Sequence, residues 1–229
     1  MESLIRYAPL LAGGALVTVS LAVISLFLAT CLGALGAAGR IGGSKFGKGA
    51  VLVYTTMARG IPDLVMILLV YFGGQRLVNT ILNAVGGEPI NVSTFWAGVV
   101  AIGFIYGAYL TETFRGAYQT IPKGQVEAAQ ALGLRGFILH WNVTIPQLIR
   151  FALPGYANVW QVLVKSTAVV SVIGLKDLVG LANDAGKTAR EPFIFFVAVL
   201  AVYLLITWAS TLIFERIEKR YSVGMANAR

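Results

Sequence analysis

Residues 125–146, QVEAAQALGLRGFILHWNVTIP, form one of the few long segments of this chain that are too polar to lie within a membrane. The first half is rich in alanine and places four apolar or small residues on one face of a short helix: Val126, Ala129, Leu132 and Gly133. We expect Glu127 to fall in the first turn, where a negative charge suits the helix dipole. This helix is expected either to dock another protein or to lie on the membrane surface.

The composition around this segment is that of a membrane protein. Of the 229 residues, 57% are hydrophobic and only 12% are charged, whereas about a quarter of the residues in a soluble domain are charged. The mean hydropathy is +0.78. The formal net charge of +8 is spread over the segments between apolar runs, which argues against nucleic-acid binding. Cys31 is the only cysteine, so no internal disulfide can form.

Five apolar segments are long enough to cross a bilayer, which takes about 20 helical residues. We expect an all-α integral membrane protein with one domain, residues 1–229, and a long polar loop at residues 118–150. The expected spans are residues 10–36, 50–74, 95–117, 151–175 and 192–214. Pro146 is expected to stop the helix of the loop and to set the direction of the fourth span.

The charges of the loops predict which side of the membrane each one faces. The loop after the first span carries Arg40, Lys45 and Lys48 without any acid. Loop charge then alternates between neutral and positive along the chain, and the C-terminal segment is positive again. Because basic loops stay in the cytoplasm, we expect a periplasmic N-terminus, a cytoplasmic C-terminus and a cytoplasmic loop at residues 118–150.

Two pairs of opposite charges lie within the expected spans. Arg59 and Asp63 are four residues apart, and Glu112 and Arg115 are three apart, so each pair is predicted to form an ion pair on one helix face. Pro62 lies between the first two residues and predicts a kink or a new helix start.

Lys165 lies near the middle of the fourth span, where a charge needs a partner or water. A charge at membrane depth is a functional hypothesis, although the two predicted pairs can also be purely structural. The candidates for the substrate path are Asp63, Glu112, Lys165, Ser166 and Thr167. His140 has no second ligand at metal-binding spacing, and no catalytic triad pattern is present, so we expect neither a metal site nor an enzyme.

The loop also carries a recognisable spacing. Glu-Ala-Ala is followed by three residues and a glycine, then by nine residues, Val-x-Ile-Pro. This pattern resembles the EAA signature of bacterial ATP-binding-cassette importer permeases, which lies in the cytoplasmic loop before the last two spans. The resemblance assigns coupling to the ATPase to Glu127, Ala128, Ala129, Gly133, Val143, Ile145 and Pro146.

The resemblance covers nearly the whole chain. The matching stretches are RGIPDLV (59–65), YGAYLTETFRGA (106–117), PKGQVEAAQALG (122–133), LVKSTAVVSVIGL (163–175) and EKRYSVG (218–224). They are similar to the polar amino acid permeases, above all to subunits of histidine, lysine, arginine and ornithine importers. This family implies a MetI-like fold in the bacterial inner membrane, surrounded by lipid.

The same family implies the partners. They are a second permease, so that the pair forms a heterodimer, an ATPase dimer that binds ATP and magnesium, and a periplasmic amino-acid-binding protein. The chain itself is expected to bind no cofactor. The alternatives that remain open are an opine or other polar amino acid importer, an ion-coupled secondary transporter and a membrane scaffold.

One position departs from the family pattern. Many of these permeases have Lys-Asp-Thr-Ser in the fourth span, whereas here Lys165 is followed by Ser166, Thr167 and Ala168. If the missing acid holds a cationic substrate, the second permease has to supply it. The sequence therefore predicts an asymmetric path.

Overall fold

The structure is a computed structural model that describes residues 2–222. These residues form helices joined by short connections, without any strand among them. The elements are α1 (Glu2–Gly42), α2 (Lys45–Gly60), α3 (Asp63–Leu68), η1 (Leu69–Gly73), α4 (Gly74–Ala84), α5 (Thr94–Thr120), α6 (Lys123–Ala131), α7 (Gly136–Leu139), η2 (His140–Thr144), α8 (Ile145–Ser166), η3 (Thr167–Ile173), α9 (Leu178–Ala189) and α10 (Pro192–Ser222). Val223 and Gly224 of the EKRYSVG motif lie outside the described residues.

Five helical stretches in the described part of the chain are long and apolar enough to cross a membrane. They are Ser3–Gly42, Asp63–Ala84, Thr94–Thr120, Gly136–Ile173 and Pro192–Tyr221. The prediction of an all-α chain with five membrane-length helices is therefore confirmed. The single domain and the exact limits of the spans within the bilayer stay predictions.

The second stretch differs from the expected 50–74. Helix α2 ends at Gly60, Ile61 is extended with φ −95° and ψ 134°, and a new helix begins at Asp63. The break at Pro62 was expected because proline lacks a backbone donor and disfavours helix at the preceding residue. The long apolar stretch then runs through α3, η1 and α4 to Ala84, ten residues past its expected end.

The helical residues at the end of this stretch had been expected to form a loop. They are amphipathic, and α4 uses its polar side chains to hold the segment that follows. Gln75 donates to the carbonyl of Ile90 and accepts from the backbone N–H of Val92, and Asn79 accepts from the N–H of Ile90. These bonds tie the segment before α5 to the polar side of α4.

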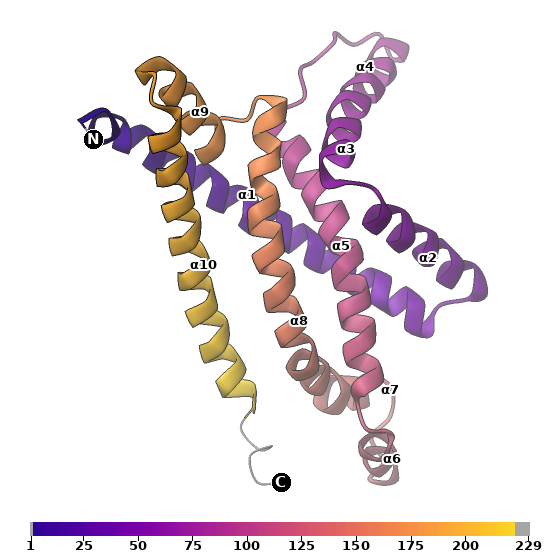
Figure 1. Ribbon diagram of the computed structural model, residues 1–229. Coiled ribbons are helices and arrows are strands. Elements are labelled where there is room, and N and C mark those ends of the chain that lie inside the picture. The colour runs from indigo at the N-terminus through magenta and orange to yellow at the C-terminus, as the bar shows by residue number, and fades with distance from the viewer. Residues whose placement is uncertain (1, 223–229) are drawn as a thin grey trace.

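Helix α5 forms the centre of the molecule, packed against α1, α2, α3 and α8, and α1 runs obliquely across it (Figure 1). Small residues allow this close approach, as expected from the glycines at the end of the first span. A Cβ on Gly33 would lie 2.6 Å from the Cβ of Leu110, and one on Gly36 would lie 2.3 Å from Oγ1 of Thr111. The position of α1 across α5 therefore depends on these two glycines.

Helix α9 was not expected, because residues 176–191 carry balanced charges and were assigned to an external loop. Asp177 caps its N-terminus by accepting a hydrogen bond of 2.9 Å from the N–H of Gly180. The helix buries Leu178, Ala182 and Ala185 against α1 and α10, and its charged residues lie on the other face. Its buried face consists mainly of small residues, so its apolar pattern was too weak to detect.

Candidate translocation and coupling sites

Asp63 lies at the start of α3, directly after the break in the second span, and contacts two other elements. Its Oδ2 accepts a hydrogen bond of 3.0 Å from the hydroxyl of Tyr106 on α5 and one of 2.5 Å from Oγ of Ser166 at the end of α8. The two hydroxyls are themselves 2.6 Å apart. Tyr106 is only 3% exposed, while Asp63 is half-buried. We name these three residues the Asp63 cluster.

The predicted ion pair between Arg59 and Asp63 is wrong. The guanidinium of Arg59 lies 5.3 Å from the ring centroid of Tyr109, and among residues 2–222 no ion pair joins it to Asp63. The rule that residues four apart share a face holds only within one helix, and here the helix ends between the two charges. The carboxylate of Asp63 is consequently surrounded by hydroxyl groups and not by a cation.

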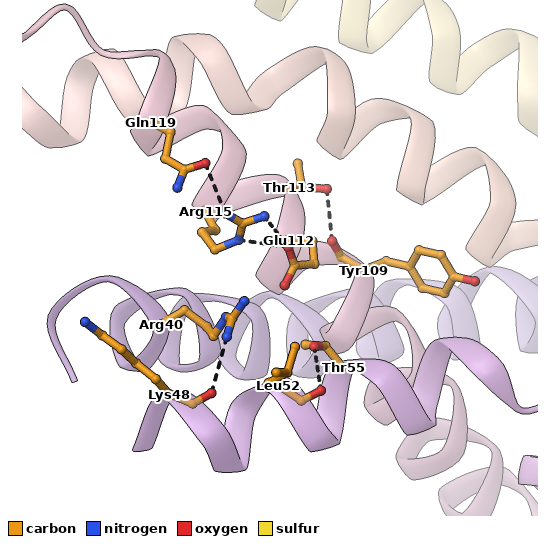
Figure 2. Close-up of polar contacts among 9 residues, drawn as sticks. All are labelled: Arg40, Lys48, Leu52, Thr55, Tyr109, Glu112, Thr113, Arg115 and Gln119. Atoms are coloured by element: carbon orange, nitrogen blue, oxygen red, sulfur yellow. Dashed lines mark hydrogen bonds and ion pairs between the residues drawn. The ribbon is translucent and has the colours of Figure 1, made fainter. Parts of the chain in front are cut away.

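The predicted pair of Glu112 and Arg115 is present (Figure 2). Nε and Nη2 of Arg115 lie 2.8 and 2.7 Å from Oε2 of Glu112, and Nη1 donates to Gln119 at 3.0 Å. Here the helix α5 is continuous, so the spacing of three residues brings the charges together.

Lys165 and Thr167 point away from the Asp63 cluster. Lys165 is exposed and lines a hollow of about 500 Å³ with residues of α9 and α10, among them Phe196 and Leu200. Thr167 is buried and its hydroxyl lies 3.2 Å from that of Tyr203 on α10. Of the five candidates for the substrate path, the structure thus brings together only Asp63 and Ser166.

Tyr106 is the residue of this cluster that sequence reasoning missed. It lies in a buried stretch of α5, where an aromatic residue is ordinary. The available signal was the spacing of Tyr106, Tyr109 and Glu112 at intervals of three residues, which places polar groups in a line along one side of α5. The rings of Tyr106 and Tyr109 stack with their centroids 5.6 Å apart.

Within the loop of residues 118–150, α5 continues to Thr120 and is followed by α6, which lies at the end of α5 farthest from α4 (Figure 1). Glu127 and Ala128 are exposed, whereas Ala129 is 6% exposed and faces the protein. Glu127 was expected in the first turn, but α6 already begins at Lys123, directly after Pro122, so Glu127 lies in the second turn. A negative charge there gains less from the helix dipole.

A cavity of about 460 Å³ lies beside α6. It is lined by Tyr118, Gln119, Ile121, Lys123, Val126, Glu127, Gln130 and Thr144. Beyond α6, four large apolar side chains of the loop are more than half exposed: Leu132, Phe137, Ile138 and Trp141. The loop therefore presents both a hollow and an apolar surface.

Gly133 ends α6 with a Schellman motif. Its φ is +84°, its N–H donates to the carbonyl of Gln130 at 2.9 Å, and the N–H of Leu134 donates to that of Ala129 at 3.0 Å. An L-residue other than glycine is strained in this conformation. Gly133 therefore sets the turn between α6 and α7.

The expectation that Pro146 stops a helix is wrong. The chain is helical from Gly136 to Ile173 without interruption, and Pro146 is the second residue of α8. The preceding turn, His140–Thr144, is π-helical, and the N–H of Ile145 donates to His140. We attribute the continuity to this wider turn, which relieves the contact of the proline ring with the helix before it. Val143 and Ile145 are half-buried in the same region.

Two carboxylates outside the apolar stretches have shifted pKa values. Burial raises the pKa of Asp177, whose Oδ1 is bonded to Gly180 while Oδ2 is buried without a hydrogen-bond partner. A hydrogen bond of 2.5 Å from Lys176 lowers the pKa of the exposed Asp184. Among residues 2–222, no three potential metal ligands lie close together.

Known proteins share this arrangement. The family model described as "Binding-protein-dependent transport system inner membrane component" matches residues 29–223. The chain is 44% identical over 215 residues to the histidine/lysine/arginine/ornithine transport system permease protein HisQ of Escherichia coli, with 94% of each chain covered. It is 38% identical to the octopine transport system permease protein OccQ of Rhizobium radiobacter over 91% of this chain and 88% of that protein.

Solved structures give the same result. An amino acid ABC transporter crystallised with histidines matches with a TM-score of 0.82 at 30% identity, over 96% of this chain and 97% of that chain. The MetNI methionine ABC transporter matches with a TM-score of 0.73 at 17% identity, over 95% and 98%, which shows a shared fold. The chain therefore belongs to the family of inner membrane components of binding-protein-dependent transport systems and is the membrane-spanning permease subunit of such a system.

Proposed function

We propose that this permease carries basic amino acids into the cell as part of an ATP-driven importer. Its relatives include the histidine/lysine/arginine/ornithine permease of Escherichia coli and the arginine ABC transporter permease ArtQ of Haemophilus influenzae, which is 37% identical over 208 residues. The loop charges support a periplasmic N-terminus and a cytoplasmic C-terminus.

The observation that carries the proposal is the Asp63 cluster. Asp63 begins a membrane-length helical stretch, and its carboxylate contacts hydroxyl groups of Tyr106 and Ser166 while no cation of residues 2–222 pairs with it. A carboxylate at membrane depth is costly unless a cation or water compensates it. A lysine, arginine or ornithine side chain supplies such a cation during passage.

The ATPase dimer is proposed to dock on α6 and on the exposed apolar residues of the loop. Helical structure continues from Gly136 to Ile173, so Ser166 lies on the same helical stretch as the exposed apolar residues of the loop at positions 137, 138 and 141. Movement of this stretch would shift Ser166 relative to Asp63. Closure of the ATPases on ATP can thereby change the environment of the carboxylate, which is the basis of alternating access.

A second permease is proposed to complete the path. The family resemblance leads us to expect an acid at the position of Ser166, so we assign the second carboxylate to the partner chain. Lys165 is exposed in the single chain, and among residues 2–222 no carboxylate pairs with it. A different partner permease that contributes an acid supplies both the carboxylate missing at Ser166 and a counter-charge for Lys165. A symmetric homodimer supplies neither.

The test is uptake by the assembled transporter. The permease pair, its ATPase and its binding protein are reconstituted in liposomes with internal ATP, and uptake of radiolabelled arginine is measured with unlabelled arginine, lysine, ornithine, histidine and glutamine as competitors. We expect the basic amino acids to compete and glutamine not to. Asp63→Asn should raise the KM for arginine, while Asp184→Asn, in the exposed and ion-paired carboxylate of α9, should not.

Collapse of the proton gradient at constant ATP separates this reading from an ion-coupled transporter, because an ATP-driven importer continues to work. A second candidate substrate class is the opines, since permeases for octopine and nopaline are 38% and 39% identical to this chain. Octopine that competes better than arginine would favour it. Uptake of neither class would refute the proposal.

A further inference from the structure

A polar cavity of about 440 Å³ lies between α1, α2 and α5 and contains no residue of the Asp63 cluster. Its lining comprises Arg40, Leu52, Thr55, Thr56, Arg59, Gly60, Tyr109 and Glu112. Figure 2 shows Arg40 of α1 pointing toward the side of α5 that carries Glu112. We name this cavity the arginine pocket.

The charges of the arginine pocket are unbalanced. Arg40 and Arg59 line it together with a single carboxylate, Glu112, whose Oε2 is already bonded to Arg115. Among residues 2–222, neither Arg40 nor Arg59 belongs to an ion pair. The pocket therefore carries excess positive charge.

The hydrogen bonds of Arg40 are also incomplete. Nη1 of Arg40 donates to the carbonyl of Lys48 over a long 3.4 Å, and its Nε is buried without a hydrogen-bond partner. Arg59 is exposed, and its guanidinium lies over the face of the Tyr109 ring. A buried guanidinium donor without an acceptor is costly, and a planar carboxylate is the acceptor that fits a guanidinium best.

The arginine pocket is connected to the Asp63 cluster along one side of α5. Tyr109 lines the pocket and stacks on Tyr106, whose hydroxyl bonds to Asp63. Tyr106 and Glu112 are six residues apart on one helix, about 9 Å at 1.5 Å per residue. The pocket thus lies close to Asp63 along α5, on the side of Asp63 that faces α6 and the loop.

We propose that the arginine pocket binds the headgroup of the transported amino acid, with Arg40 and Arg59 facing the carboxylate and Glu112 facing the ammonium group. This inference rests on the proposed function and extends it to a second subsite. The opposite charge of Glu112 within the same cavity disfavours a phosphate dianion and favours a zwitterion. A basic amino acid can place its side chain toward Asp63 and its headgroup in the arginine pocket.

The experiment compares L-arginine with L-argininamide, which keeps the guanidinium and the ammonium group but lacks the carboxylate charge. Binding of both radiolabelled compounds is measured on the assembled transporter in nanodiscs without the binding protein. Arg59→Gln should weaken binding of L-arginine by about tenfold, as expected for the loss of a charge-assisted hydrogen bond. It should leave binding of L-argininamide unchanged.

Arg40→Gln should also weaken binding of L-arginine and not of L-argininamide. If the loss of the partly buried Arg40 prevents folding, the Arg59→Gln variant still tests the proposal. The matched control is Arg76→Gln, an exposed arginine of α4 outside the pocket, which should change neither affinity. Equal losses for both compounds, or no loss in either pocket variant, would overturn the proposal. The proposal would also be overturned if the wild-type transporter takes up arginine in liposomes but does not bind it in the nanodiscs.

The headgroup of an anionic lipid is the competing ligand of the arginine pocket. The binding measurements are therefore repeated in nanodiscs of phosphatidylcholine alone and of phosphatidylcholine with phosphatidylglycerol. The proposal predicts the same tenfold loss in both lipids. A loss of arginine binding that occurs only with the anionic lipid assigns the pocket to the lipid headgroup and refutes the amino acid subsite. If the transporter takes up no amino acid at all, the proposed function fails first, and the two failures are distinguished.

Discussion

The hydroxyl of Tyr106 donates a hydrogen bond of 3.0 Å to Oδ2 of Asp63, across 43 positions of sequence. It is one of two hydroxyls that hold this carboxylate, and the tyrosine ring is fixed independently by stacking on Tyr109. The orientation of Asp63 thus depends on the hydroxyl of Tyr106, which can be removed while the Tyr106 ring stays in place.

Tyr106→Phe is therefore expected to raise the KM for a basic amino acid by about tenfold, the effect of one hydrogen bond to a charged group, with kcat little changed. Uptake kinetics in liposomes measure both values. Tyr7→Phe is the control, because Tyr7 lies outside the Asp63 cluster and the arginine pocket and packs its ring against that of Phe195. Equal KM values for wild type and Tyr106→Phe would show that Asp63 does not depend on this hydroxyl.

Two neighbouring glycines of α1 test how α9 is held. A Cβ on Gly14 would lie 2.9 Å from Cα of Leu178 and 3.0 Å from the carbonyl oxygen of Asp177, whereas a Cβ on Gly13 meets nothing within 4 Å. Because the neighbour of Gly14 is backbone, Gly14→Ala should destabilise the protein by about 1–3 kcal/mol. Gly13→Ala should be neutral or stabilising. Thermal unfolding of the purified chain compares them, and equal melting temperatures would contradict the packing.

Local signals in the sequence predicted much of the fold. The length of the apolar runs predicted five membrane-length helices, Pro62 predicted the break in the second span, and the spacing of Glu112 and Arg115 predicted their ion pair. Each of these depends on residues within a few positions of one another. The pair of Arg59 and Asp63 failed because the helix ends between them.

The Asp63 cluster was beyond such reasoning, since Ser166 lies 103 positions from Asp63 and 60 from Tyr106. Only the packing of α3, α5 and α8 brings these residues together. The arginine pocket likewise joins α1, α2 and α5. The sequence identified the charged residues within the long apolar stretches, and the fold determined which of them meet.

Asp177 allows a prediction about pH. Burial raises its pKa above the ordinary 3.8, so the folded state binds a proton more readily than the unfolded state. Stability contributed by the neutral form is present at low pH and is lost as pH rises through the raised pKa. Asparagine is also a good N-cap and carries no charge.

Asp177→Asn should therefore become more stable relative to wild type as pH rises from 4 to 7, while Asp177→Ala, which removes the cap, should cost about 1 kcal/mol. Melting temperatures of the purified proteins across this pH range measure the difference. A difference between wild type and Asp177→Asn that stays constant with pH would show that the carboxylate is not titrated by folding.

Glu127 tests the docking surface. Its side chain is exposed and lines the cavity beside α6, so reversal of its charge should disturb a partner more than the fold. Glu127→Lys is expected to lower ATP-dependent uptake by more than about tenfold without affecting membrane insertion. Glu88→Lys makes the same change of charge at an exposed position between α4 and α5, away from α6, and should retain most uptake. Normal uptake by Glu127→Lys would remove the basis for docking at α6.

Gly133 tests whether the turn after α6 transmits force. Its φ of +84° and the Schellman bonds at the end of α6 tolerate asparagine better than a β-branched residue. A residue such as valine costs about 1–2 kcal/mol in this conformation, which is enough to reorient α6 while the membrane helices stay folded. We expect Gly133→Val to abolish stimulation of ATP hydrolysis by the loaded binding protein, and Gly133→Asn to retain a substantial part. ATPase assays on the reconstituted transporter measure this order. If both variants lose stimulation equally, the loss comes from the side chain at the partner interface and not from the turn.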